Sequence, residues 1–296
     1  MNCPACDSCE CEYNGGETRE LKRVQITTQY EFYSCTACKS SFVEPREIKP
    51  AESYAEQGEF YRWRWDFEEL IHDLEGIPTP PRRILEVGCG EGILLEKLAH
   101  GYEAWGLDFN REAVNAARSK GLKAFPCTVG EFRVLHAEIL FDAVALFHVI
   151  EHVAEPFLFL KEIREVLVKG GRLFISVPNP DRYNLKFERE VWDFPPHHIT
   201  RFSKAGISSL LKRAGFEICK TADQPMGRPS GRSMIHTLKN YYYKRVPLPK
   251  VVRQTLKVPI FMLLHFYAMH LAVSLSRNST EQSFYLMAKR NETYRT

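Results

Sequence analysis

The run ILEVGCGEG, residues 84–92, is a short apolar strand followed directly by glycines at alternate positions. Glycines at 88, 90 and 92 permit a tight turn with positive φ and allow a ligand to approach the backbone closely. Apolar residues at helical spacing begin at Ile93, so the glycines are expected to join a strand to the N-terminus of a helix. A glycine-rich turn alone is weak evidence, because an ordinary strand–helix connection has the same pattern.

An acidic residue at the end of the next strand strengthens this interpretation. Asp108 follows the apolar run AWGL at 104–107. At that place in a parallel sheet, a carboxylate can accept both hydrogen bonds of a ribose diol. The glycine pattern differs from the dinucleotide fingerprint, because its last spacing is shorter and Glu86 precedes it.

Alternating strands and helices continue through the middle of the chain. From Arg82 to Asn179, short apolar strands alternate with amphipathic helices, and the strand FDAVALFHV is followed by a helix that is expected to reach Lys169. A further helix and two strands, FEICKTAD at 216–223 and SFYLMAKR at 283–290, complete the set. The sequence therefore predicts an α/β fold with a seven-stranded, mostly parallel, Rossmann-like sheet.

The predicted domain organisation adds further segments to this core. The core covers 82–223 and 282–291, and it is preceded by a cysteine-containing segment at 1–48 and a helical linker at 49–81. A helical, apolar insertion at 224–281 contains VPIFMLLHFYAMHLAVSL, which resembles a short membrane span. A single crossing would place the last strand on the wrong side of the bilayer, so a lid, an oligomer contact or a membrane-docking helix is expected instead.

Several runs resemble the motifs of class I S-adenosylmethionine-dependent methyltransferases. ILEVGCGEG resembles their motif I, and GLDFN resembles their ribose-binding acidic motif. FDAVALFHVIEHVAEP and LVKGGRLFISVPNP resemble the segments around their fourth and fifth strands, so the resemblance covers roughly residues 82–222. It implies an enzyme that uses S-adenosylmethionine. The residues expected at this cofactor are Glu86, Gly88, Cys89, Gly90, Gly92, Asp108, Phe109, Cys127, Thr128 and Phe147.

The resemblance also implies a role for each part of the cofactor site. The glycines would back the methionine part, Asp108 would hold the ribose hydroxyls, and Phe109 would flank the adenine. Cys127 and Thr128 fall where the family contacts the adenine amine.

Candidate catalytic residues follow the fourth and fifth strands. His148, Glu151 and His152 come after the fourth strand, and His198 comes after the fifth, at the carboxyl ends where such sheets bind ligands. Histidine suits a general base, because its pKa lies near physiological pH. The structural alternative places Glu151 at a helix N-terminus and lets His152 bond the backbone.

The run HVIEH resembles the E-x-x-E-H run of quinone-precursor O-methyltransferases, which can hold a divalent metal. His148 replaces the first glutamate, although imidazole and carboxylate can still bind a catalytic divalent metal together. The signature of many enzymes that methylate nucleobase amines is replaced by Leu146-Phe147-His148-Val149. This favours oxygen as the methyl acceptor, with carbon or aliphatic nitrogen left open. A small-molecule, sugar or lipid-linked acceptor is expected.

The cysteines predict a structural zinc ribbon at 1–48. Six of the nine cysteines lie in the first 40 residues, and no secretion signal is recognised at the start, so a reducing cytoplasm and metal ligation are expected. Two C-x-x-C pairs can complete a tetrahedral site. Cys9 and Cys11 offer alternative ligands. The preferred ligands are Cys3, Cys6, Cys35 and Cys38.

Charge disfavours nucleic acid as a partner. The chain has 40 Lys and Arg against 37 Asp and Glu, and residues 1–48 contain no basic run. The alternatives left open are a zinc-ribbon RNA methyltransferase and a non-catalytic scaffold of the same fold. Basic residues between 239 and 257 precede the apolar part of the insertion, so peripheral membrane contact through 239–275 is a further hypothesis. The chain is also a candidate for oligomer formation.

Overall fold

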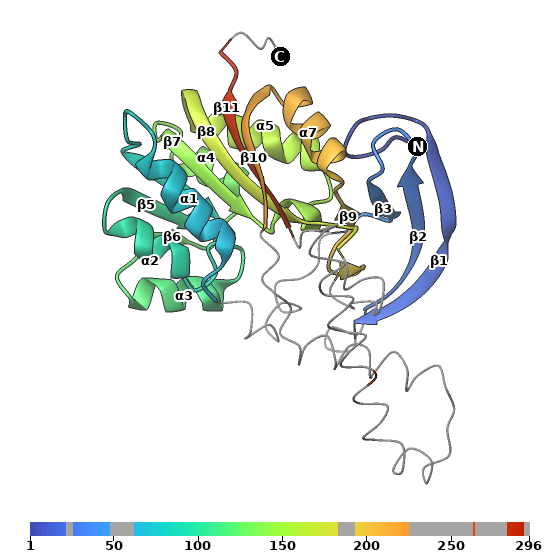
Figure 1. The fold of residues 1–296 in the computed structure, drawn as a ribbon. Coiled ribbons are helices and arrows are strands. Elements are labelled where there is room, and N and C mark those ends of the chain that lie inside the picture. The colour runs from blue at the N-terminus through green and yellow to red at the C-terminus, as the bar shows by residue number, and fades with distance from the viewer. Residues whose placement is uncertain (22–25, 48–61, 183–192, 225–262, 264–282, 293–296) are drawn as a thin grey trace.

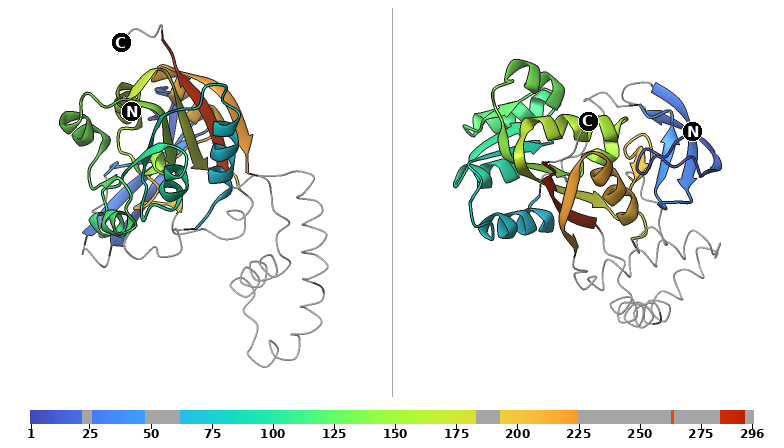
Figure 2. Two further views of the ribbon diagram at one scale, coloured as in Figure 1. Left: turned by 90° about the vertical axis from the view of Figure 1, so that its left-hand side faces the viewer. Right: turned by 90° about the horizontal axis from the view of Figure 1, so that it is seen from above.

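The protein consists of two sheets that lie side by side in the computed structural model. One has helices on both faces, and the other is built mostly from the N-terminal segment (Figure 1). In the further views of Figure 2, the N-terminal sheet lies beside one end of the larger α/β part. The residues that the structure describes are 1–21, 26–47, 62–182, 193–224, 263 and 283–292.

The larger sheet has seven strands in the order β10-β11-β8-β7-β4-β5-β6. The pairs from β8 to β6 are parallel, and β11 is antiparallel to both of its neighbours. The chain order reverses between β4 and β7, where ligands bind in sheets of this kind. This confirms the predicted fold class. The strands are β4 (Arg83–Val87), β5 (Glu103–Leu107), β6 (Ala124–Phe125), β7 (Phe141–Phe147), β8 (Leu167–Pro178), β10 (Phe216–Asp223) and β11 (Ser283–Arg290).

Helices cover both faces of this sheet because successive strand residues point to opposite sides. Ile84 belongs to one apolar cluster and Leu85 to the other. The cluster with Ile84 includes buried residues of α1 (Trp65–Glu75), α2 (Ile93–Ala99) and α3 (Arg111–Ser119). The cluster with Leu85 includes those of α4 (Val129–Leu135), α5 (Pro156–Val166) and α7 (Lys204–Arg213).

The smaller sheet joins the N-terminal segment to the core. An antiparallel hairpin of β1 (Cys11–Leu21) and β2 (Ile26–Cys35) is followed by β3 (Ser41–Glu44). The fourth strand, β9 (Thr200–Arg201), comes from the core and pairs with β3. We did not expect β9 from the sequence, and it shows that the N-terminal segment is continuous in hydrogen bonding with the α/β part.

Some elements differ in extent from the sequence-based expectation. The helix after β7 ends at Val166 and not at Lys169, because Leu167 already pairs with Phe141 at the start of β8. A short 3₁₀ helix, η2 (Ile150–His152), precedes it. The predicted insertion at 224–281 lies almost wholly outside the described residues, as does the proposed membrane contact. None of the helices in the described parts is long and apolar enough to cross a membrane.

Candidate active site

A cavity of about 980 Å³ opens at the carboxyl ends of β4, β5, β7 and β8. Its size is sufficient for a nucleoside cofactor beside a small acceptor. Two predicted residues, Gly92 and Glu151, do not line it. The predicted residues that do line it are Glu86, Gly88, Cys89, Gly90, Asp108, Phe109, Cys127, Thr128, Phe147, His148, His152 and His198.

The glycine turn lies at the end of β4 and needs its glycines for two different reasons. Gly88 has a φ of 78°, and a Cβ there would lie 2.5 Å from Cγ2 of Val149. Gly92 has a φ of 80°, and its Cβ would lie 2.6 Å from Cδ1 of Leu122. The absence of a side chain at Gly88 therefore leaves room for Val149 beside the turn. The absence of one at Gly92 lets α2 pack closely against the end of α3.

Gly88→Ala is expected to destabilise the protein by about 1–3 kcal/mol and to weaken S-adenosylmethionine binding, because the new methyl group combines positive-φ strain with a clash. Gly121→Ala is the matched control, since Gly121 has a φ of 81° but nothing lies within 4 Å of a Cβ there. Thermal unfolding and calorimetric titration measure both effects. Equal losses in the two variants would show that the contact with Val149 is unimportant.

Asp108 holds the turn against the end of β5. One carboxylate oxygen accepts a hydrogen bond from the backbone N–H of Gly90 at 2.9 Å, and the other accepts one from Asn110 at 2.8 Å. Burial raises the pKa of Asp108, although these N–H groups act in the opposite direction. The carboxylate is thus fixed in orientation at the place where the sequence predicted a ribose contact.

The part of the cavity where the sequence predicted the adenine contact is formed around the start of α4, a helix that we did not expect. The Thr128 hydroxyl accepts a hydrogen bond from the Glu131 N–H at 3.2 Å, and Glu131 accepts one from the Thr128 N–H at 2.8 Å. This is a capping box, and the T-x-x-E spacing was visible in the sequence. The Thr128 hydroxyl therefore stabilises a helix end, while the half-buried Cys127 lies beside it.

Glu86 and Phe147 form part of the cavity floor. Burial raises the pKa of Glu86 well above its usual value, so its carboxyl group favours the neutral form. The ring centroid of Phe147 lies 5.8 Å from that of Phe67 and 6.2 Å from that of Tyr285. Phe147 is thus fixed by aromatic contacts from α1 and β11.

His148 lies between two buried carboxylates. Its Nε2 is 3.5 Å from Asp66, and its Nδ1 is 3.4 Å from Glu151. Burial and the Arg64 charge act to lower the pKa of His148, but the two carboxylates outweigh them and raise it. Although burial acts in the opposite direction, His148 also holds the pKa values of Asp66 and Glu151 at about 2. The raised pKa favours the protonated form of His148, which neutralises the carboxylates and is poorly suited to accept a proton.

Asp66 is a site residue that the sequence analysis missed. It lies on α1, is fully buried, and accepts a hydrogen bond from the Ser176 hydroxyl at 2.6 Å. Arg64 forms an ion pair with its other oxygen at 3.1 Å. The available signal was an acidic residue within the aromatic run before the core.

Three of the predicted catalytic residues meet beside the cavity. Glu151, His152 and His198 each offer one potential ligand atom, and these atoms lie within 4.8 Å of one another. The His152 Nδ1 is 2.7 Å from the carbonyl oxygen of His197, as the structural alternative for His152 anticipated. Glu151 is 1% exposed, and neither of its oxygens has a hydrogen-bond partner among the described residues.

Asp193 fixes the orientation of the His198 ring through its Nδ1. Its carboxylate lies 3.2 Å from the His198 Nδ1 and 3.0 Å from guanidinium nitrogens of Arg182 and Arg201. Burial acts to raise the pKa of Asp193, but His198 and the two arginines lower it. The sequence analysis did not single out Asp193, because it lies eight residues from Arg201, 11 from Arg182 and 41 from His152 in the chain.

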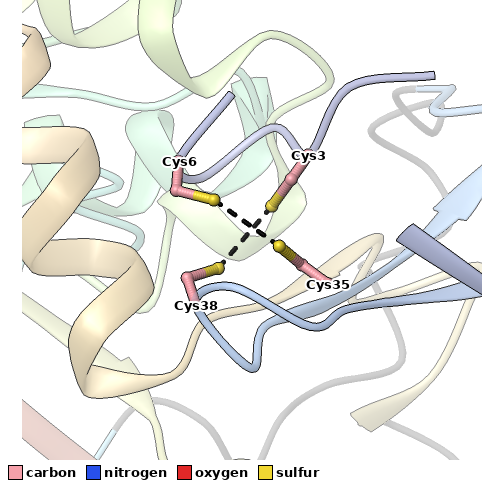
Figure 3. Close-up of side chains that lie close together, drawn as sticks. All are labelled: Cys3, Cys6, Cys35 and Cys38. Atoms are coloured by element: carbon pink, nitrogen blue, oxygen red, sulfur yellow. Dashed lines mark hydrogen bonds between the residues drawn. The ribbon is translucent and has the colours of Figure 1, made fainter. Parts of the chain in front are cut away.

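The four outer cysteines form a second centre, at the junction of the N-terminal sheet and the core (Figure 3). The Cys3 and Cys38 sulfurs are 3.7 Å apart, and those of Cys6 and Cys35 are 3.5 Å apart. All four sulfur atoms lie within 4.8 Å of one another, close enough for one metal ion to contact them all. The other candidates, Cys9 and Cys11, are not part of this group.

Comparison with known proteins points to one family. A family described as a methyltransferase domain matches residues 54–221. A ubiquinone biosynthesis O-methyltransferase of Xanthomonas oryzae pv. oryzae (strain PXO99A) is 34% identical over 171 residues, which cover 52% of this chain and 69% of that protein. One from Vibrio vulnificus (strain YJ016) is 30% identical over 162 residues, covering 48% and 66%.

A solved structure shares the fold. It is the complex of the Haloferax volcanii Trm112 methyltransferase activator with a methyltransferase, with a TM-score of 0.54 and 16% identity, covering 83% of this chain and 99% of that chain. The chain therefore belongs to the methyltransferase domain family, and it is a class I S-adenosylmethionine-dependent methyltransferase.

Proposed function

We propose that the enzyme methylates an oxygen atom of a small-molecule acceptor, and that Glu151, His152 and His198 hold a divalent cation on the acceptor side of the cavity. The names of the relatives that are 30–34% identical support an oxygen acceptor. So does the run Leu146–Val149, which replaces the signature of nucleobase-amine methyltransferases.

The state of Glu151 is the observation that carries this proposal. A carboxylate that is buried without hydrogen bonds is costly unless another charge compensates it. His148 supplies part of that compensation at 3.4 Å, but it also faces Asp66. A cation held by Glu151 together with His152 and His198 would satisfy the remaining requirement.

The two other histidines have the orientation that metal ligands need. A carbonyl oxygen can only accept a hydrogen bond, so His152 carries its proton on Nδ1 and leaves a lone pair on Nε2. His198 directs Nδ1 at the ionised Asp193, which leaves its Nε2 facing Glu151 at 4.0 Å. Hydrogen bonds through the second ring nitrogen are typical of histidines that bind metals. Imidazole and carboxylate together therefore fit a divalent transition metal.

The remaining residues position the reactants. Asp108 and the glycine turn would hold the cofactor, while Asp66 and His148 keep Glu151 in place. In the transfer, the acceptor oxygen bonds to the methyl carbon as the bond from that carbon to sulfur breaks, leaving a neutral thioether. The acceptor hydroxyl gives up its proton to a solvent water molecule in this step. A bound cation would lower the pKa of such a hydroxyl.

Glu151→Gln is expected to lower turnover by at least about tenfold, because the neutral amide cannot balance the cation and the histidines. Binding of Mn²⁺, followed by its electron paramagnetic resonance signal, should be lost in the same variant. Affinity for S-adenosylhomocysteine should change less than about twofold, since Glu151 does not line the cofactor part of the cavity.

The matched control is Glu162→Gln, which changes a glutamate that lines the same cavity away from the histidines. It should retain Mn²⁺ binding and turnover. A wild-type protein that binds S-adenosylhomocysteine but no divalent cation would remove the cation from the proposal. His198 would then be left as the candidate base.

We further propose that the four outer cysteines hold a structural zinc ion. Their sulfurs belong to two tight C-x-x-C turns, and thiolate ligands in a tetrahedral set are those that structural zinc prefers. The contact between Cys3 and Cys38 lowers the pKa of the Cys38 thiol, which favours its thiolate form, and raises the pKa of the Cys3 thiol.

A further inference from the structure

The N-terminal sheet contacts both of the short segments that carry the proposed cation ligands. Glu151 and His152 belong to η2, and His198 lies two residues before β9. Figure 1 shows β9 at the edge of the N-terminal sheet, where it pairs with β3. A 3₁₀ helix of three residues and a strand of two have few hydrogen bonds of their own, so their positions depend on what packs against them.

Hydrogen bonds connect β3 to both segments in series. The Val43 N–H of β3 donates to the Ile199 carbonyl at 3.1 Å, and the Ile199 N–H donates to the Glu151 carbonyl at 3.0 Å. The His152 Nδ1–H donates to the His197 carbonyl at 2.7 Å. The segment before β9 is therefore bonded to β3 on one side and to η2 on the other.

Apolar packing surrounds these hydrogen bonds. Tyr30 of β2, Val43 of β3 and Ile199 form one buried cluster, in which no side chain is more than 3% exposed. Ala154, two residues after η2, packs against this cluster. Hydrogen bonds beside such a cluster are stronger than those in water, because the local dielectric is low. Both η2 and the segment before β9 thus rest on the N-terminal sheet.

Arg46 adds a side-chain contact from the N-terminal segment to the chain just after η2. Its guanidinium group donates to the Ala154 carbonyl at 3.1 Å and lies 3.7 Å from the Glu155 carboxylate. Its Nε donates to the Glu44 carboxylate of β3 at 2.9 Å. The side chain is 19% exposed and does not line the part of the active-site cavity that the structure describes. Because the guanidinium fork is planar and bonded at both ends, Arg46 fixes Ala154 relative to β3.

We propose that the N-terminal sheet positions the proposed cation site, and that Arg46 is a positioning residue for methyl transfer. Val43 holds the segment that carries His198, while Arg46 holds the segment that carries Glu151 and His152. The sheet thereby sets the distance between the ligands on the two segments. This inference rests on the proposed function, because it takes these three ligands to act on the acceptor.

Arg46→Gln tests the inference in the full-length, zinc-loaded protein saturated with S-adenosylhomocysteine. Mn²⁺ affinity, followed by electron paramagnetic resonance, should fall about tenfold, because the loss of a charge-assisted hydrogen bond frees the end of η2. The ring ¹⁵N signals of His152, assigned with His152→Gln, should also change, since the bond to the His197 carbonyl fixes one tautomer. Affinity for S-adenosylhomocysteine, measured separately, should stay within about twofold of the wild type, because Arg46 lies outside the cavity lining.

The matched control is Arg213→Gln, because Arg213 also joins the N-terminal segment to the core. It donates to the Ala5 carbonyl at 3.2 Å and pairs with Asp7 at 3.1 Å, in the first cysteine turn instead of beside η2. This variant should lower the melting temperature about as much as Arg46→Gln does, but leave Mn²⁺ affinity and the His152 signals at their wild-type values. Arg46→Lys, which keeps the charge without the planar fork, should show an intermediate loss, and it replaces Arg46→Gln if that variant does not fold.

Wild-type Mn²⁺ affinity together with unchanged His152 signals in Arg46→Gln would overturn the inference. Equal changes in Arg213→Gln would overturn it as well, because they would show only a general loosening of the N-terminal segment. A wild-type protein that binds no Mn²⁺ would instead contradict the proposed cation site. In that case, changed His152 signals in Arg46→Gln would still support the positioning role, and unchanged signals would exclude it.

Discussion

Asp108→Ala is expected to weaken S-adenosylmethionine binding by at least about 100-fold, measured by calorimetry. A carboxylate that accepts two ribose hydroxyl hydrogen bonds contributes roughly 1.5–3 kcal/mol through each, and about 3 kcal/mol corresponds to that factor. The substitution also removes the acceptor for the Gly90 and Asn110 N–H groups, so the turn keeps the Gly88 and Cys89 hydrogen bonds to the Leu107 carbonyl of β5 but loses the one from Gly90. Both effects act in the same direction.

Asp142→Ala provides a matched control at the opposite end of the sheet. Asp142 also accepts two backbone hydrogen bonds, from the N–H groups of Arg82 and Arg83, each at 2.8 Å. Its loss should lower the melting temperature without changing cofactor affinity. If Asp108→Ala bound the cofactor as tightly as Asp142→Ala does, Asp108 would not be the ribose-binding residue.

The parts that the sequence predicted are those specified by residues close together in the chain. The glycine turn is encoded within nine residues, and its conformation depends on the absence of side chains at Gly88 and Gly92. The alternation of strands and helices likewise requires only local periodicity. These local signals were sufficient for the fold class, because parallel strands with short helical crossovers have few allowed arrangements.

The parts that were missed depend on contacts between distant segments. Asp66 reaches His148 and Ser176 from a helix whose sequence reads as an aromatic linker. β9 has two residues, too few for a strand pattern, and is defined only by its pairing with β3. Asp193 likewise gains its importance from the arginines around it. Single-sequence periodicity carries no information about such contacts.

The cysteine site could be predicted only in part from the sequence. The C-x-x-C spacing predicted two tight turns but left Cys9 and Cys11 open as ligands. The structure brings Cys3, Cys6 and Cys38 together with Cys35 and leaves Cys9 exposed. The spacing between the pairs, which sequence alone could not interpret, is spanned by the long β1–β2 hairpin.

Cys38→Ser is expected to abolish zinc binding and to lower the melting temperature by roughly 10 °C, because a structural zinc site contributes directly to folding free energy. The effect should extend beyond the ribbon. Cys38 is packed in the same apolar cluster as Ile207 and Leu210 of α7, and its carbonyl accepts a hydrogen bond from the Ser203 hydroxyl. Zinc content and thermal unfolding of the purified variant measure both results.

Cys9→Ser tests whether Cys9 is itself a zinc ligand. Cys9 is exposed and lies three residues from Cys6. It would replace Cys3 as a ligand if Cys6 and Cys9 formed the first C-x-x-C pair of the site. With the outer pairs as ligands, this variant should retain its full zinc content and the wild-type melting temperature. Full zinc content in Cys38→Ser, together with loss of zinc in Cys9→Ser, would show that Cys9 is a ligand and Cys38 is not. The docking of β3 against β9 would then need no metal at Cys38, because the β3–β9 pairing and the Ser40 and Ser203 hydrogen bonds would hold that junction.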